Sequence, residues 1–175
     1  MGEDLPMITP AYVQTMAAYN AELNRRVFGA VLRLPDAVRR ADGGLFWGSI
    51  HGTLSHIYWA DRMWLSRLGF GEAVPVAIGD SDGLFDGFEA MWEERQRLDA
   101  GIVGWAGGLG AADLAGDLGW WSGSTQRQVV RPRALCVMQL FNHQTHHRGQ
   151  VHALITRAGE DTGATDLPFV LQRTP

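Results

Sequence analysis

Apolar residues recur along most of the chain at steps of three and four, the spacing that places them on one face of an α-helix. Four segments show this pattern, over residues 9–34, 45–68, 82–102 and 133–158. Thr9-Pro10 opens the first segment, where threonine can cap a helix and proline fits the first helical position. We therefore predict four amphipathic helices.

Breaker residues indicate where these helices begin and end. Asp42-Gly43-Gly44 separates the first two, and Ser81 or Asp82 is expected to cap the third. Gly104–Gly110 contains four glycines, so we expect this segment to be irregular. Gly159 is the expected C-terminal cap of the last helix. The connections between helices are therefore predicted to be short.

One stretch before the last helix departs from the helical spacing. Residues 118–122 and 126–131 flank Gly123-Ser124-Thr125, a pattern that indicates a short β-hairpin. Near the end of the chain, Asp166-Leu167-Pro168 suits one short helical turn. Strands and helices do not alternate, so the predicted fold class is all-α, a four-helix bundle forming a single domain over residues 1–175.

Composition excludes several classes of function. The chain has 15 basic and 19 acidic residues, a net charge of −4, and no clustered basic patch, so we expect no nucleic-acid partner. All the basic residues are arginine, which excludes a Schiff-base lysine and a P-loop. One cysteine, Cys136, allows neither an internal disulfide nor a cysteine-type zinc site. Without a signal-like start or a long apolar run, we expect a cytoplasmic protein with no membrane partner.

Histidines supply the candidate chemistry, and four of the six fall on the last predicted helix. His143 and His147 lie about 40° apart around the helix axis and one turn apart along it, so both imidazoles can bind one metal ion. His146 lies about 60° from His143 on the other side, which makes it a poorer partner. Gln144 stands where a zinc metalloprotease has its glutamate, so that class is not expected.

A third ligand has to come from another helix. The second predicted helix offers His51 and His56, which lie about 140° apart, so only one of them can face the pair. His56 is the better embedded, because it shares a side with Gly52, Trp59, Ala60 and Met63. Three neutral histidines would leave a coordination position open for water or substrate, as in reactive metal sites.

Two segments of the chain resemble the DinB (damage-inducible) family. The first is Phe141–Gln150, which contains the string Asn-His-x-x-His-His-Arg-Gly-Gln, and the second is His51–Ile57, followed by Ala60–Leu65. Tyr19-Asn20 is a weaker third match, and the resemblance extends from about Tyr12 to Gly159. It implies an up-down-down-up bundle, usually a homodimer, with metal ligands at the positions of His56, His143 and His147.

The resemblance also suggests a type of chemistry. Related bundles include thiol-dependent S-transferases and a mycothiol-dependent isomerase, in which the metal activates a thiol. We therefore expect a divalent transition metal, zinc or nickel before iron or copper, with a low-molecular-weight thiol and a small-molecule substrate. The competing hypothesis is a non-catalytic metal-binding stress-response protein whose site is structural.

Further residues near the histidines are candidates for supporting roles. Gln150 shares the face of the histidine pair and could orient a ligand, whereas Arg148 could pair with a substrate carboxylate or with Asp61. Asn142 could fix the tautomer of a ligand histidine. For Cys136 a buried core position is the favoured interpretation. Trp120-Trp121 could line a pocket mouth or a dimer contact.

Overall fold

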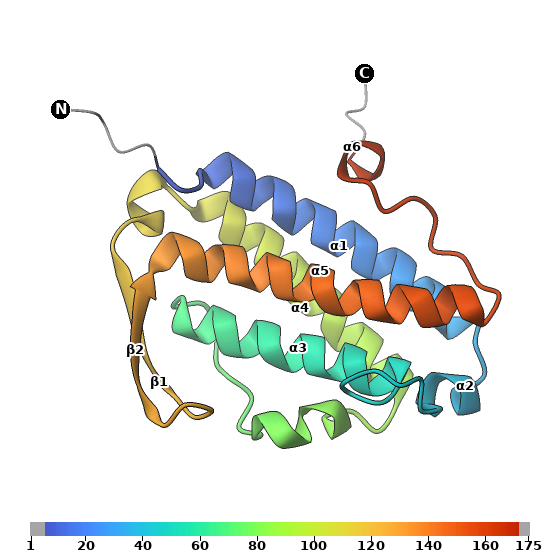
Figure 1. The fold of residues 1–175 in the computed structure, drawn as a ribbon. Helices are drawn as coiled ribbons and strands as arrows, with labels where there is room; N and C mark the ends of the chain where they lie inside the picture. The colour runs from blue at the N-terminus through green and yellow to red at the C-terminus, as the bar shows by residue number, and fades with distance from the viewer. Residues whose placement is uncertain (1–5, 172–175) are drawn as a thin grey trace.

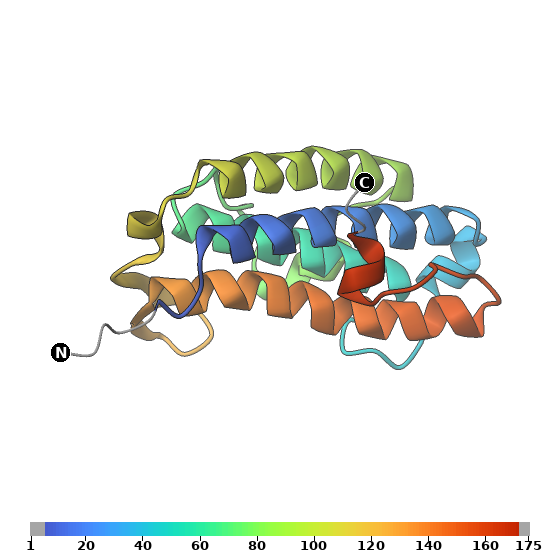
Figure 2. The ribbon, with the colours of Figure 1, turned by 90° about the horizontal axis from the view of Figure 1, so that it is seen from above.

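The computed structural model describes residues 6–171 and contains four long helices, α1 (Pro10–Leu32), α3 (Ile50–Arg67), α4 (Phe88–Gly108) and α5 (Arg133–Arg157). α1 and α5 run in one direction and α3 and α4 in the other, so the bundle has the expected up-down-down-up topology (Figure 1). Seen from above, the helices lie nearly side by side along their lengths (Figure 2). Within the described range, no helix combines the length and apolar character that crossing a membrane requires.

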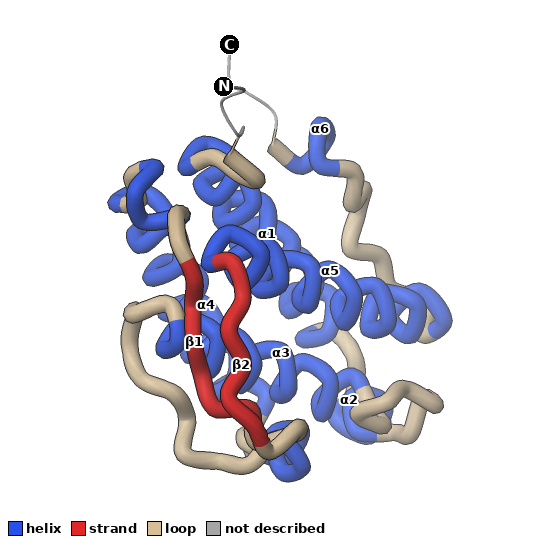
Figure 3. The backbone as a smooth tube through the Cα atoms, turned by 60° about the vertical axis from the view of Figure 1, so that its left-hand side comes forward, coloured by secondary structure: helices blue, strands red, loops and turns tan. Residues whose placement is uncertain are grey.

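Shorter elements connect and flank the bundle. They are α2 (Asp36–Arg40), the 3₁₀ helices η1 (Ile78–Gly83) and η2 (Ala111–Leu114), the strands β1 (Asp117–Ser122) and β2 (Arg127–Pro132), and α6 (Leu167–Val170). The strands form the predicted hairpin, in antiparallel register with Trp120 opposite Val129 (Figure 3). The predicted helical turn near the C-terminus is also present, as α6, and residues 172–175 lie outside the described part.

Three predicted boundaries are wrong. Helix α3 begins at Ile50 rather than at residue 45, because Gly44 and Gly48 adopt positive φ and form a tight turn before it. Helix α4 begins at Phe88, since Ser81 and Asp82 lie in η1. It then continues to Gly108, so residues 104–108 are helical. Gly104, Gly107 and Gly108 each lower helix stability by about 1 kcal/mol relative to alanine. The packing of the buried Ala106 on the core outweighs this loss.

The bundle interior consists of two apolar clusters separated by a polar layer. One cluster is at the end near the hairpin and includes Val13, Leu140 and Phe141, and the other includes Phe28 and Phe88. Between them along the helices lie buried polar side chains from all four long helices: Asn20, Asn24, Asp61, Arg95, Asp99, Gln144 and Arg148. The polar layer is therefore at the same level of the bundle as the histidines of α3 and α5.

Ion pairs and amide groups satisfy most of this layer. Arg95 donates to Asp61 at 2.5 Å and to Asp99 at 2.6 Å, and Asn24 donates to Asp99 at 3.0 Å. Arg148 donates to Gln144 at 2.8 Å and to the side-chain oxygens of two asparagines of α1. Two buried cations thus balance two buried carboxylates, which limits the cost of taking these charges out of water.

Candidate metal centre

The three histidines singled out from the sequence meet at one point between α3 and α5. One ring nitrogen from each of His56, His143 and His147 lies within 4.8 Å of the other two. The Nε2 atoms of His56 and His143 are 3.2 Å apart, and the rings of His143 and His147 are 4.5 Å apart between centroids. The two α5 histidines are one helical turn apart, so the helix itself places them together.

Hydrogen bonds fix which nitrogen of two of these rings faces the centre. His56 Nδ1 lies 2.8 Å from the Ser81 hydroxyl oxygen, and that hydroxyl donates to the carbonyl of Ile78 at 2.7 Å. Because the hydroxyl hydrogen is already donated to Ile78, the Ser81 oxygen accepts a hydrogen bond from His56 Nδ1–H, and the lone pair of the ring is on Nε2. His147 Nδ1 likewise donates to the Gln150 side-chain oxygen at 2.8 Å.

This donor set fits a transition-metal ion. His56 and His147 direct Nε2 lone pairs toward the same point, and each has the outer hydrogen bond that metal-ligating histidines require. His143 Nδ1 is buried without a hydrogen-bond partner among the described residues. Without a metal, His143 Nε2–H can donate to the His56 Nε2 lone pair across the 3.2 Å contact, and a metal ion bound here would take the place of that proton. Imidazole nitrogen suits zinc, nickel, copper and iron.

Burial keeps these imidazoles neutral. It lowers the pKa of His56 to about 3 and that of His143 to about 4, and each shift is increased by neighbouring histidines. Burial also lowers the pKa of His147, against an opposing effect of the hydrogen bond to Gln150. Neutral imidazole is the form that binds metals, so all three rings are ready to act as ligands at neutral pH.

The histidine cluster opens into a cavity of about 460 Å³ with apolar walls. Trp47 stacks on His56 with ring centroids 3.9 Å apart, and Phe46, which is 81% exposed, packs edge-on against Trp47. The remaining apolar wall residues are Trp59, Ala60, Met63, Trp64 and Ile78. Among residues 6–171, no aspartate, glutamate or arginine lines this cavity, so the histidines are the ionisable groups of its described wall.

The three supporting residues proposed from the sequence lie in different places. Gln150 lies on the cavity wall and bonds His147. Arg148 is buried in the polar layer, and Asp61, one of the two partners suggested for it, bonds Arg95 instead. Asn142 is exposed, has no hydrogen bond to a histidine, and lines a neighbouring cavity.

Two other histidines, His51 and His146, lie outside the cluster in different surroundings. His51 is buried, but its Nε2 lies 2.7 Å from the Phe85 carbonyl oxygen, away from the cluster. His146 is exposed and lines the histidine cavity, with its ring 4.9 Å from that of His147. Sequence reasoning did not identify Ser81 and Trp47 as neighbours of His56, because neither belongs to the helical spacing that locates the ligands.

The fold is an up-down-down-up bundle, and three histidines meet between its second and last long helices. The protein is therefore a helical-bundle protein with a candidate metal centre. A family comparison gives the same result over nearly the whole chain. Residues 7–174 match the model of the DinB family, and the chain belongs to that family. No curated protein and no solved structure matches it, so no reaction or substrate comes to this chain from a relative.

Proposed function

We propose that this protein is a metal-dependent enzyme that transfers the sulfur of a low-molecular-weight thiol to a small apolar electrophile. His56, His143 and His147 would hold one divalent transition metal, with zinc and nickel favoured over iron and copper. The observation that supports this most strongly is the open cavity above a three-histidine set. A structural site would be closed by four protein ligands.

The metal would supply Lewis acidity, which lowers the pKa of a thiol that it coordinates. The reaction forms one sulfur–carbon bond and breaks the bond between that carbon and its leaving group. The leaving group keeps the bonding electrons, and the thiol proton is released, so no oxidant or reductant is required. His146 is the ionisable wall residue outside the cluster, and we assign it to receive that proton.

The remaining wall residues would bind and orient the electrophile. Trp47, Trp59 and Phe46 present aromatic surface beside His56, which suits an apolar or planar group and excludes water. Ser81 and Gln150 would hold the two ligand rings in the productive orientation. The family resemblance supports the thiol, and the apolar wall supports the uncharged electrophile.

Metal analysis of variants tests the ligand assignment. Protein purified without an affinity tag should contain about one transition-metal ion per chain. His56→Ala, His143→Ala and His147→Ala should each reduce that content strongly. His51→Ala is the matched control, since His51 is buried on the same helix but points elsewhere, and it should retain the metal. Full metal content in the triple alanine variant would refute the site.

Activity assays separate an enzyme from a structural metal protein. Metal-loaded protein should accelerate the displacement of a leaving group from an apolar electrophile by a thiol, and His146→Ala should lose rate while keeping its metal. The competing function is a structural metal that ties α3 to α5, which the position of the cluster between these helices favours. Chelation that unfolds the protein, with no rate acceleration for any thiol tested, would support the structural role.

A further inference from the structure

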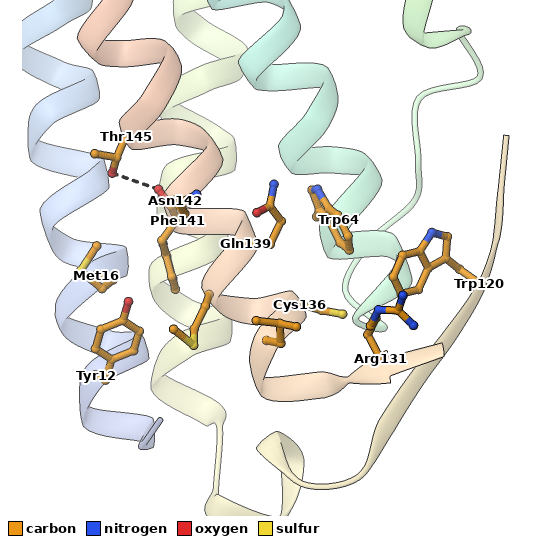
Figure 4. A pocket seen from close by; sticks show the side chains of 12 residues that line it. Tyr12, Met16, Trp64, Trp120, Arg131, Cys136, Gln139, Phe141, Asn142 and Thr145 are labelled. Carbon is orange, nitrogen blue, oxygen red and sulfur yellow. Dashed lines mark hydrogen bonds between the residues drawn. The ribbon is translucent and has the colours of Figure 1, made fainter. Parts of the chain in front are cut away.

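A second cavity, of about 520 Å³, lies beside the histidine cavity and shares only Trp64 with it. It is formed by the first turns of α1, the first half of α5, the end of α3 and the hairpin (Figure 4). Its size is that of a pocket for a small organic molecule. The metal chemistry proposed above does not use it.

Aromatic side chains form two opposite parts of its wall. Tyr12 meets Phe141 edge-on at 6.5 Å between ring centroids, and Trp64 meets Trp120 edge-on at 5.5 Å. Figure 4 shows the first pair on the α1 side and the second on the hairpin side. Met16 and Met138 also line the cavity, and their flexible side chains can adapt to the shape of a ligand. This arrangement suits an apolar or aromatic molecular body.

Positive charge gathers at the hairpin side of the same cavity. Arg131 lines it, and the guanidinium of Arg67 lies 4.9 Å from the Trp64 ring centroid and 5.2 Å from that of Trp120. Within residues 6–171 neither arginine has an ion-pair partner, and no acidic residue lines the cavity. An anion would therefore meet charges that no carboxylate of the described chain neutralises.

Neutral polar groups complete the lining. Gln139 and Asn142 line the cavity, and Figure 4 shows Gln139 between the two aromatic pairs and Asn142 beside Phe141. Neither side chain makes a hydrogen bond in the part of the chain that the structure describes. Arg131 Nη1 donates to the Val130 carbonyl at 2.7 Å, and the other N–H groups of its guanidinium make no hydrogen bond within the described residues. These N–H groups and the two side-chain amides can orient the polar end of a ligand.

We propose that this second cavity binds a small amphipathic carboxylate, with its acidic group at Arg131 and its apolar body between the aromatic pairs. Arginine and carboxylate form two parallel hydrogen bonds, and this gives the acidic end a defined orientation. Apolar burial along the aromatic wall supplies most of the affinity. The site is separate from the histidine centre and does not depend on bound metal.

Calorimetric titration with a matched pair of probes tests the charge requirement. 4-Phenylbutanoate should bind, whereas 4-phenylbutanamide, with the same body and no charge, should bind at least about tenfold more weakly. Arg131→Gln should remove this difference. Arg127→Gln is the control, because Arg127 is exposed on the same strand and does not line the cavity. No binding of 4-phenylbutanoate at millimolar concentration overturns the proposal.

Two further measurements locate the bound molecule. His56→Ala should leave 4-phenylbutanoate affinity unchanged, and a loss would place the carboxylate at the metal site instead. Cys136, the single cysteine, lines the second cavity, so bound 4-phenylbutanoate should slow its alkylation several-fold. Unchanged alkylation in the saturated protein overturns the location. A dimer that buries this face would also overturn the location. Such a dimer would appear as a molecular mass that rises with protein concentration in the wild type but not in Trp120→Ala.

Discussion

His56 Nδ1 lies 2.8 Å from the hydroxyl oxygen of Ser81, and the hydroxyl is the acceptor in this hydrogen bond because its own proton goes to a backbone carbonyl. Ser81 is fully buried in η1, in the connection between α3 and α4, yet it determines which nitrogen of an α3 side chain faces the histidine cluster. A residue outside the long helices therefore fixes the tautomer of a candidate metal ligand.

Replacement of Ser81 by alanine should weaken metal binding. Without the acceptor, His56 can carry its proton on Nε2, the nitrogen that faces the cluster, so we expect affinity to fall about 10- to 100-fold. Competition with a chelating dye measures this. Ser66→Ala is the control, because its hydroxyl bonds only the Met63 carbonyl of the same helix. Equal affinity for both variants would rule out the orienting role of Ser81.

Gln150 should act on His147 in the same way. Gln150→Leu removes the acceptor of the 2.8 Å hydrogen bond and should weaken metal binding about tenfold. Gln150→Glu retains an acceptor oxygen and should keep the affinity close to that of the wild type. The same competition assay applies. If the leucine and glutamate variants bind equally well, the hydrogen bond does not position the ligand.

Arg95 should be the residue of the polar layer with the largest effect on folding. Arg95→Met leaves Asp61 and Asp99 buried without their cation, which should lower the free energy of unfolding by about 3–5 kcal/mol. Chemical denaturation measures this. Arg97→Met, which removes exposed ion pairs on the same helix, should cost less than about 1 kcal/mol. Similar losses for both variants would contradict the importance of burial.

Acid should destabilise the metal-free protein through His56. Burial lowers its pKa to about 3, whereas an unfolded chain has a histidine pKa of about 6.5. Between these values the unfolded state binds the proton and the folded state does not, so the free energy of unfolding falls as pH decreases. In the His56→Leu variant, this contribution to the fall in the free energy of unfolding is absent. Denaturation curves from pH 7 to about 4 should therefore diverge, and parallel curves would contradict the shift.

Sequence periodicity by itself determined the helices and the histidine pair. Steps of three and four predicted α1 and α5 within about two residues, and one helical turn of α5 necessarily places His143 beside His147. The turn residues around Gly123 likewise predicted the hairpin. These features depend on near neighbours in the chain, whose geometry the backbone period controls.

Only the tertiary structure decided which distant groups complete the site. Spacing left His51 and His56 as alternatives, and the family resemblance favoured His56. The packing of α3 against α5 brings its ring to the pair. Packing of α1 against α5 brings Arg148 to the asparagines of the polar layer, and the segments that flank α3 place Ser81 and Trp47 against His56. The His56–Ser81 and Arg148–Asn20 contacts join residues 25 and 128 positions apart, and irregular segments separate their helices. No periodic pattern in the sequence encodes where such segments lead.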